Sequence, residues 1–403
     1  EIQANTSVSE IETWLRVFKD EKVGLATGAI DSKDSVADLV KSAVSNWNQA
    51  TSTSSVAVPE QQELSFTPMS DAAIIKEDPV ERAGKLARAV ELVESNGLTY
   101  TGSVSTRSIR RTLLSTRNAH YDLSATMVDA SCTVSDSNGN SGWARHFGTE
   151  LKHIDLLNLA ELAAKKAIKG KSKTSIKPGK HTVILEPAAV GSMLLFLGFL
   201  SFGGRVFNRG TSFLAGKVGQ RVMPEHFTIY DDTSDLRSHG WPIDYEGTPS
   251  QKAMLVEKGI ARGVVHDATT ANQAGASSTG HALAPGNGFG PYPRCVHMDG
   301  GTETLDSITQ KLDKAILVTR LWYINYANPM RTMITGTTRD GTFLINNGKI
   351  GDAVSDMRFV VSILEAFNRS VYLSKERRYV RQFGSTLHVP WMVIPDFPFT
   401  EVL

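Results

Sequence analysis

The chain has 403 residues, a length that predicts two domains, each large enough to bury a core. Its composition, 41% hydrophobic and 21% charged, is that of an ordinary globular protein and excludes a disordered, collagen-like or coiled-coil chain. Its 43 Lys and Arg residues nearly balance its 42 Asp and Glu residues, so we expect no direct binding to nucleic acid, which normally requires a basic excess or a basic face.

The first third of the chain predicts strands and helices in alternation. Apolar residues in period 2 over residues 11–17, followed after a polar break by residues 23–30, predict a β-hairpin. Helical spacing then predicts a helix from Asp34. A second helix is expected to begin at the Asp-Pro pair at 78–79, because Asp is a favoured N-cap and Pro a favoured first residue, and to end at the Asn-Gly pair at 96–97.

The next elements lead to a candidate domain boundary. Residues 98–149 predict two or three antiparallel strands, and residues 156–168 predict a helix after them. The Lys- and Ser-rich stretch 171–179 is the best candidate for a linker. It would divide the chain into an N-terminal domain, residues 1–170, and a C-terminal domain, residues 180–403.

Short strands separated by tight turns dominate the second half. The Asp340-Gly341 pair predicts a turn between two strands, and Asn347-Gly348 predicts a type I′ hairpin turn. Helices are predicted over residues 187–200, 305–314 and 359–367. The fold class is therefore α+β: an N-terminal α/β domain with antiparallel strands and helices, followed by a mainly antiparallel β domain.

Two features bear on location. The most apolar stretch, residues 190–202, is shorter than the roughly 20 residues that a bilayer-spanning helix needs, so we expect no membrane segment. Cys132 and Cys295 are too few for a disulfide framework and predict buried thiols in a cytoplasmic protein.

A search for metal-ligand spacing among the ten histidines finds no pair on one helical face. We therefore interpret each histidine as a surface residue or a hydrogen-bonded core residue. A zinc site assembled from residues far apart in the chain stays open, because spacing along the sequence cannot reveal it.

Two loop segments are rich in Gly, hydroxyl, acidic and Arg residues. They are residues 208–219 and residues 244–249. This mixture suits a surface that receives an extended peptide or another subunit, although composition alone favours ordinary turns and caps.

The same segments carry a family resemblance. Residues 208–219, with the sequence NRGTSFLAGKVG, resemble the signature of the TldD/TldE (PmbA) metalloprotease family, also described as modulators of DNA gyrase. Other segments also resemble motifs of the family and occur in the family's order. They are residues 178–187, which precede this segment, and residues 227–232, 243–249, 278–281 and 343–350, which come after it. The resemblance implies a two-domain protomer, two of which pack around a cavity that degrades or trims peptides, and a family helix that would precede Glu1.

The resemblance also says where the metal would be. TldD-type chains carry zinc on a His-Glu-x-x-x-His helix and on a Cys near the C-terminus. The corresponding helix here, residues 185–195, has no His, and Phe383 stands where a Cys is expected. Zinc hydrolysis typically needs three protein ligands and an open water position, which Ala, Val, Met and Leu cannot supply. The chain is thus similar to the TldE/PmbA-type partner, with no metal on this chain and zinc on a TldD-type partner.

The hypothesis is therefore a non-metal subunit of a cytoplasmic heterodimeric peptidase that acts on small or unfolded peptides. No residue of this chain is predicted to be catalytic or to bind metal. The residues expected to contact the peptide or the partner are Arg209, Thr211, Asp244, Glu246 and His281. Two alternatives stay open: a homodimer that binds a peptide or other ligand without cleaving it, and an independent hydrolase with an unrecognised site.

Overall fold

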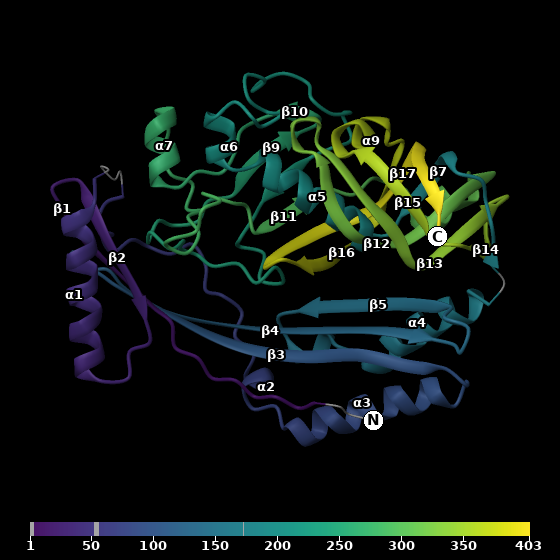
Figure 1. Cartoon of the computed structure of the whole chain (residues 1–403), viewed down its shortest axis with the longest axis horizontal. Helices are drawn as coiled ribbons and strands as arrows, with labels where there is room; N and C mark the ends of the chain where they lie inside the picture. Colours follow the sequence, from purple (N-terminus) through teal and green to yellow (C-terminus); the bar gives the residue numbers. More distant parts are fainter. Residues whose placement is uncertain (1–3, 52–55, 172) are drawn as a thin grey trace.

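The computed structural model describes residues 4–51, 56–171 and 173–403. These residues form a two-stranded, a three-stranded and a twelve-stranded sheet. In Figure 1 the three-stranded sheet lies below the large sheet, and the two-stranded hairpin stands with its helix at one end of the molecule. The α+β fold class predicted from the sequence is confirmed.

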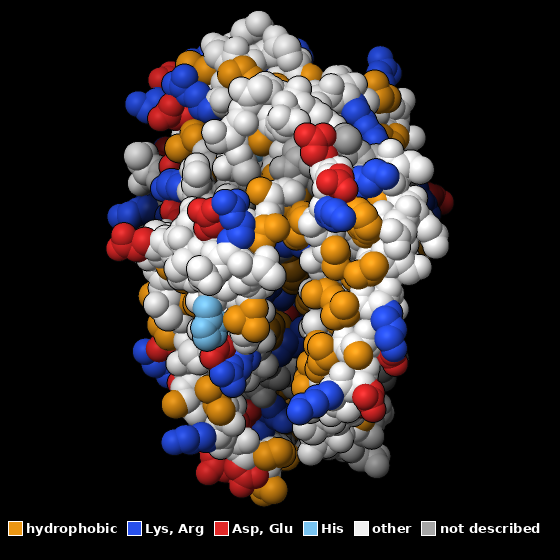
Figure 2. Space-filling view, turned by 90° about the vertical axis from the view of Figure 1, so that its left-hand side faces the viewer, with side chains coloured by type: hydrophobic (Ala, Val, Ile, Leu, Met, Phe, Trp, Pro, Cys, Tyr) orange, Lys and Arg blue, Asp and Glu red, His pale blue; other side chains and the backbone are white. Residues whose placement is uncertain are grey.

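The N-terminal hairpin pairs β1 (Thr13–Lys19) with β2 (Lys22–Gly28), as predicted. Helix α1 (Lys33–Gln49) packs on it, and Ser32 caps the helix through a capping box with Ser35. The strand and helix approach closely at Gly24, where a Cβ atom would lie 2.0 Å from the carbonyl oxygen of Ala43. Figure 2 views this end of the molecule and shows hydrophobic side chains gathered beside a hollow.

The three-stranded sheet has the order β3–β4–β5 and is antiparallel throughout. Its strands are β3 (Thr99–Leu114), β4 (His120–Ser135) and β5 (Ser141–Gly148). Helix α2 (Ala72–Ile75) is short, whereas α3 (Pro79–Glu94) and α4 (Leu156–Lys169) share one apolar core with β4. Asp78 caps α3 and Pro79 is its first residue, as predicted.

The large sheet has the order β10-β9-β8-β11-β17-β7-β12-β13-β14-β6, with β15 paired to β13 and β17, and β16 paired to β17. Most pairs are antiparallel, whereas β7–β12, β11–β17 and β6–β14 are parallel. The strands are β6 (Lys173–Thr174), β7 (Gly179–Leu185), β8 (Ile229–Asp231), β9 (Ala253–Glu257), β10 (Ile260–Ala261), β11 (Cys295–Met298), β12 (Lys314–Asn328), β13 (Met333–Asn346), β14 (Lys349–Val354), β15 (Met357–Ser362), β16 (Tyr372–Gln382) and β17 (Ser385–Val402).

Helix α5 (Pro187–Ser201) contributes to the largest hydrophobic core, which it shares with strands of this sheet. Eleven of the fifteen residues of α5 are buried, which fits its apolar sequence. The remaining helices of the C-terminal region are short: α6 (Gly204–Asn208), α7 (Ala268–Ala274), α8 (Leu305–Gln310) and α9 (Ile363–Arg369). No helix among the described residues is both long enough and apolar enough to cross a bilayer.

Some sequence predictions for the C-terminal region are wrong. Residues 359–362 belong to β15, and the helix begins only at Ile363, after the cap Ser362. Asp340-Gly341 is not a hairpin turn, because β13 runs through it while β12 pairs with both sides. The hairpin at Asn347-Gly348 is confirmed, with both residues at positive φ and Asn346 paired with Lys349.

The predicted domain division at residues 171–179 stays a prediction. Within this stretch Lys173–Thr174 forms β6, which pairs with β14 at the edge of the large sheet. Residues 13–169 supply the hairpin, the three-stranded sheet and helices α1 to α4, and the later residues supply the large sheet.

Candidate functional site

A cavity of about 410 Å³ lies where the two larger sheets approach each other. Its walls come from β5, α5, β12 and the turn between β16 and β17. The lining residues are Trp143, Arg145, Ala188, Ser192, Phe196, Arg320, Leu321, Trp322, Tyr323, Ile324, Gln382 and Phe383. This size and the mixture of aromatic and polar groups are typical of a ligand-binding site.

Neutral polar groups join α5 to the end of β16. The side-chain amide of Gln382 donates from Nε2 to Ser192 Oγ at 3.0 Å and to the Ala188 carbonyl at 3.3 Å. Ser192 Oγ also donates to the Ala188 carbonyl at 2.9 Å. These bonds hold the helix against the turn that carries Phe383, so the two segments that the family resemblance links to zinc do meet in space.

Arg320 on β12 supplies a positive charge to the cavity wall. Its guanidinium lies over the ring of Trp143 at 4.8 Å and over that of Trp322 at 4.7 Å. Its Nε donates to Oδ2 of Asp340 at 2.6 Å. Burial lowers the pKa of Arg320, whereas the Asp340 carboxylate opposes this shift.

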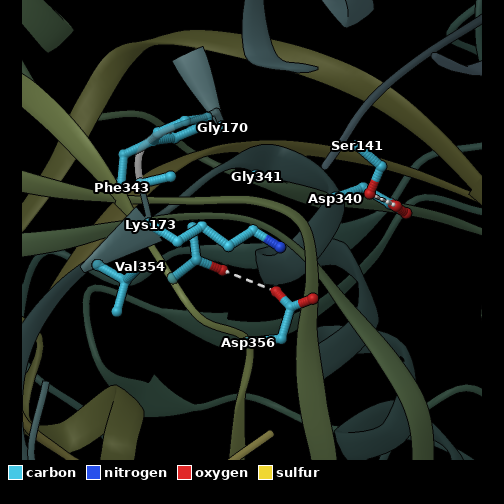
Figure 3. A pocket seen from close by; sticks show the side chains of 10 residues that line it. Ser141, Gly170, Lys173, Asp340, Gly341, Phe343, Val354 and Asp356 are labelled. Atoms are coloured by element: carbon cyan, nitrogen blue, oxygen red, sulfur yellow. Dashed lines mark hydrogen bonds between the residues drawn. The ribbon is translucent and has the colours of Figure 1, made fainter. Parts of the chain in front are cut away.

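Asp340 also contacts the N-terminal sheet. Ser141 of β5 donates to its Oδ1 at 2.7 Å, as Figure 3 shows at the edge of a second, much smaller cavity. Arg145, the other arginine of the large cavity, pairs with Asp129 on β4. Both cavity arginines are thus held by carboxylates, and they form a fixed cationic wall beside aromatic rings.

This cavity does not fit a zinc ion. Among the described residues that line it, none is a His, Cys, Asp or Glu. Zinc sites in proteins use His, Cys and carboxylate ligands. Aromatic faces, a hydroxyl, an amide and two guanidiniums can instead hold an extended chain through stacking and hydrogen bonds.

The five residues predicted from the sequence lie outside this cavity lining. Arg209 and Thr211 are exposed in the loop after α6, and the Thr211 hydroxyl donates to the Val206 carbonyl. Because Arg209 is exposed, its side chain can contact another molecule. Contact of Arg209 or Thr211 with the peptide or the partner stays a prediction.

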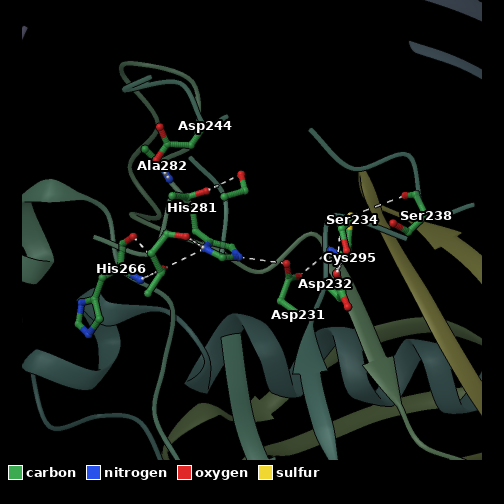
Figure 4. Close-up of polar contacts among 12 residues, drawn as sticks. Asp231, Asp232, Ser234, Ser238, Asp244, His266, His281, Ala282 and Cys295 are labelled. Atoms are coloured by element: carbon green, nitrogen blue, oxygen red, sulfur yellow. Dashed lines mark hydrogen bonds and ion pairs between the residues drawn. The ribbon is translucent and has the colours of Figure 1, made fainter. Parts of the chain in front are cut away.

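The structure brings the other three together on neighbouring loops, because Asp244 accepts the N–H groups of Glu246 and of Ala282, which follows His281. Figure 4 shows Asp244 and His281. Asp244 is 2% exposed and accepts backbone N–H groups of Glu246, Thr248 and Ala282, so it organises this turn. Burial raises its pKa. His281 is also buried and lies 3.0 Å from Asp231, which in turn accepts the N–H of Cys295 at 2.7 Å.

Glu246 accepts the backbone N–H of Ala268 at the start of α7, at 2.9 Å. Burial is the main cause that raises its pKa to about 7. Asp244, Glu246 and His281 therefore have structural partners within the chain, and their contact with a peptide or partner stays a prediction.

The fold brings together one group of side chains that could bind a metal ion and that the sequence analysis did not predict. Asp235, His297 and His388 come within reach of one another although they are far apart in the chain. The cause is strand pairing, since His297 on β11 is the register partner of His388 on β17. No spacing rule relates such positions, so only the topology could have found them.

Comparison with known proteins identifies the family. Residues 178–401, more than half of the chain, match the model of the PmbA/TldA metallopeptidase C-terminal domain. The chain belongs to the PmbA/TldA metallopeptidase family. The TldD/PmbA resemblance of the sequence motifs is thereby confirmed.

The sequence identity to individual members of the PmbA/TldA family is low. A metalloprotease TldD homolog of Buchnera aphidicola is 29% identical over 230 residues, which are 56% of this chain and 44% of that protein. A metalloprotease PmbA homolog of Haemophilus influenzae is 24% identical over 326 residues, 76% of this chain and 68% of that protein. The match to the Buchnera protein thus spans less than half of that relative's length.

The fold itself is shared over nearly the whole chain. The crystal structure of TldE from Thermococcus kodakarensis superposes with a TM-score of 0.86 at 22% identity, and the match covers 97% of this chain and 90% of that one. At this level of identity the likeness establishes the common fold of the PmbA/TldA family.

Proposed function

We propose that this chain is the non-metal, TldE-like subunit of a cytoplasmic TldD/TldE-type zinc metallopeptidase that degrades or trims small or unfolded peptides. A TldD-type partner would carry the zinc and perform the hydrolysis. This chain would shape the cavity and the partner interface. Membership of the PmbA/TldA metallopeptidase family supports the reaction class.

The observation that carries the proposal is the composition of the cavity at α5. The resemblance links this helix and the turn at Phe383 to the zinc ligands of TldD-type chains. Here the two segments meet through Ser192 and Gln382, neither of which is a zinc ligand of the usual kind. A chain with these groups at that place cannot lower the pKa of a bound water or polarise a peptide carbonyl through a metal.

The cavity also suggests how this subunit would assist. Arg320 and Arg145 present charge, and Trp143 and Trp322 present aromatic faces, along one wall. Such a wall can hold an extended peptide through its carbonyls, its carboxylates and its apolar side chains. Chain ends and unfolded segments would enter, whereas folded proteins would be excluded by the cavity's size.

The test is to measure peptidase activity of the purified chain alone and together with a TldD-type chain. An unstructured peptide with a fluorescent reporter is the substrate. We expect no cleavage by the chain alone and cleavage by the mixture, which ends when the partner's zinc-binding His residues are replaced. Cleavage by the lone chain would contradict the proposal and favour an independent hydrolase. Peptide binding by a homodimer, with no activity in any mixture, would favour the pure binding alternative.

A substitution in the cavity separates a structural from a substrate role. Ser192→Trp would fill the cavity, and we expect the activity of the mixed complex to fall at least tenfold while the complex still assembles. Ser307→Trp, on the separate short helix α8, is the matched control and should leave the activity unchanged. Equal activity of the two variants would contradict a role of this cavity in holding the peptide.

A further inference from the structure

Four aromatic side chains form a row across neighbouring strands of the large sheet. Tyr230 on β8 pairs in register with His297 on β11, His297 pairs with His388 on β17, and His388 pairs with Tyr379 on β16. The rings of Tyr379 and His388 stack with centroids 4.0 Å apart, and those of Tyr230 and His297 stack at 5.1 Å. The pair of imidazoles therefore lies between two tyrosine rings, one stacked on each imidazole.

Between the two stacked pairs, the imidazoles of His297 and His388 contact each other edge to face. Their rings are nearly perpendicular, with centroids 5.5 Å apart. Asp235, in the loop after β8, reaches the same point. Its Oδ2 lies 3.9 Å from His297 Nε2, and one ligand atom from each of the three side chains lies within 4.8 Å of the other two.

A second observation points to a ligand at this place. His297 is 4% exposed, and its Nε2 atom has no hydrogen-bond partner among the described residues. A buried polar atom of this kind costs free energy unless something occupies the space that it faces. His297 Nε2 lies 3.9 Å from Asp235 Oδ2, and the ligand atoms of the three side chains lie within 4.8 Å of one another, so a cation between them would satisfy it.

The charge state of the group suits a cation. Both imidazoles are buried, and burial favours the neutral ring, which keeps a lone pair for a metal. Asp235 adds a carboxylate. Arg237 and Arg377 oppose a cation, although Asp299, 3.4 Å from Arg377, offsets part of the charge of that arginine.

Tyr379 positions the carboxylate. Its hydroxyl donates to Asp235 Oδ2 at 2.5 Å while its ring stacks on His388. One side chain thus fixes the orientation of two candidate ligands, as the outer groups around metal sites do.

We propose that Asp235, His297 and His388 bind one divalent transition-metal ion, with zinc as the representative ion. Two imidazoles and one carboxylate form a donor set that suits zinc and its neighbours in the first transition row. Zinc bonds of 2.0–2.2 Å place tetrahedral ligand atoms roughly 3.4 Å apart. The three side chains must therefore close by about 1.5 Å at most on binding. A water molecule would complete the coordination.

This site is separate from the cavity at α5, because none of its three residues lines that cavity. It goes beyond the proposed function, in which non-metal means that the zinc that performs hydrolysis lies on the partner. It would replace the expectation from the sequence that no residue of this chain binds metal, and it assigns no peptidase step to the ion. Binding would tie the loop after β8 to strands β11 and β17, and so fix one end of the large sheet.

The experiment is a titration of the full chain, freed of metal by a chelator, with Zn²⁺ and with Co²⁺. We expect one ion per chain by elemental analysis, and a visible absorption band from low-coordinate cobalt. Asp235→Asn and His388→Gln should each weaken Zn²⁺ binding about 100-fold, and Tyr379→Phe about tenfold. His153→Gln, which changes a half-exposed histidine beside Glu150, is the matched control and should bind as the wild type does.

Two results would overturn the site: no binding of Zn²⁺ or Co²⁺ by the wild type at a tenfold excess, or full binding by the Asp235→Asn/His388→Gln double variant. Asp235 is partly exposed in a loop, so its variant is expected to fold, and circular dichroism checks this. A zinc-loaded lone chain without peptidase activity agrees with both proposals. Activity of the lone chain that disappears in His388→Gln would support the site and overturn the proposed function.

Discussion

Arg320 and Asp340 form a buried ion pair across strands β12 and β13. Arg320 donates through both Nε and Nη2 to the same carboxylate oxygen, and the side chain of Asp340 is only 3% exposed. The other carboxylate oxygen accepts the hydroxyl of Ser141 from β5. One carboxylate therefore orients an arginine of the large cavity and joins the two larger sheets.

Asp340→Asn is predicted to destabilise the protein. It removes the charge opposite a buried guanidinium, and breaking such a pair costs about 3–5 kcal/mol because the remaining charge is unpaired. We expect the free energy of unfolding in urea to fall by about 3 kcal/mol. The control is Glu401→Gln, which breaks the exposed pair with Arg358 and should change the value by about 0.5 kcal/mol or less. Similar losses in the two variants would show that the Arg320–Asp340 pair is not effectively buried.

Gly142→Ala is predicted to disturb the packing of β5 on α4. A Cβ atom at Gly142 would lie 2.1 Å from the carbonyl oxygen of Ala163, and this backbone atom cannot move without shifting the helix. We expect a loss of about 2–4 kcal/mol in the free energy of unfolding. Gly84→Ala in α3 is the matched control, because nothing lies within 4 Å of its Cβ position. That variant should gain about 0.5–1 kcal/mol from helix propensity, and a loss comparable to that of Gly142→Ala would contradict the argument.

Local chemistry made much of the fold predictable from the sequence. Asp78 could be predicted as a helix cap because its carboxylate satisfies an N–H group within the next turn, and it does so in the structure. Asn347-Gly348 was readable as a hairpin turn because these residues tolerate a left-handed backbone. Such signals depend on only a few neighbouring residues, so they can be interpreted from the sequence without knowledge of the fold.

Long-range pairing could not be predicted in this way. Asp340-Gly341 has the left-handed backbone of a turn, with φ values of 56° and 125°, yet β13 continues through it because β12 and β15 pair with its flanks. Similarly, His297 and His388 become neighbours only through the parallel pairing of two strands. The cavity at α5 depends on the contact between two sheets, which leaves no local pattern.

Glu246→Gln is predicted to change the pH dependence of stability. Burial, with Asp244 and Asp267 nearby, raises the folded-state pKa of Glu246 to about 7, against the ordinary value of 4.5. The folded state therefore binds the proton more tightly, and stability falls as the pH rises from about 4.5 through 7. Glutamine cannot ionise, so the variant should match the wild type near pH 4.5 and exceed it by about 1–2 kcal/mol at pH 8. Urea unfolding at several pH values measures this, and a constant difference between the two proteins would contradict the shifted pKa.

Phe383→Asn is predicted to separate stability from function. Phe383 and Gly384 form the two-residue turn between β16 and β17, with φ values of 45° and 81°, a geometry that favours Asn over Phe at the first position. The Phe383 side chain is also 80% exposed beside the cavity, so its ring adds little to the core.

The variant should therefore gain about 0.5–1 kcal/mol in the free energy of unfolding of the lone chain. If the exposed ring contacts the peptide or the TldD-type partner, as the proposed function implies, the peptidase activity of the mixed complex should fall severalfold. Phe383→Tyr keeps the ring and should retain that activity. A stabilised Phe383→Asn variant with full activity would show that the ring has no part in the complex, because neither folding nor catalysis would then require it.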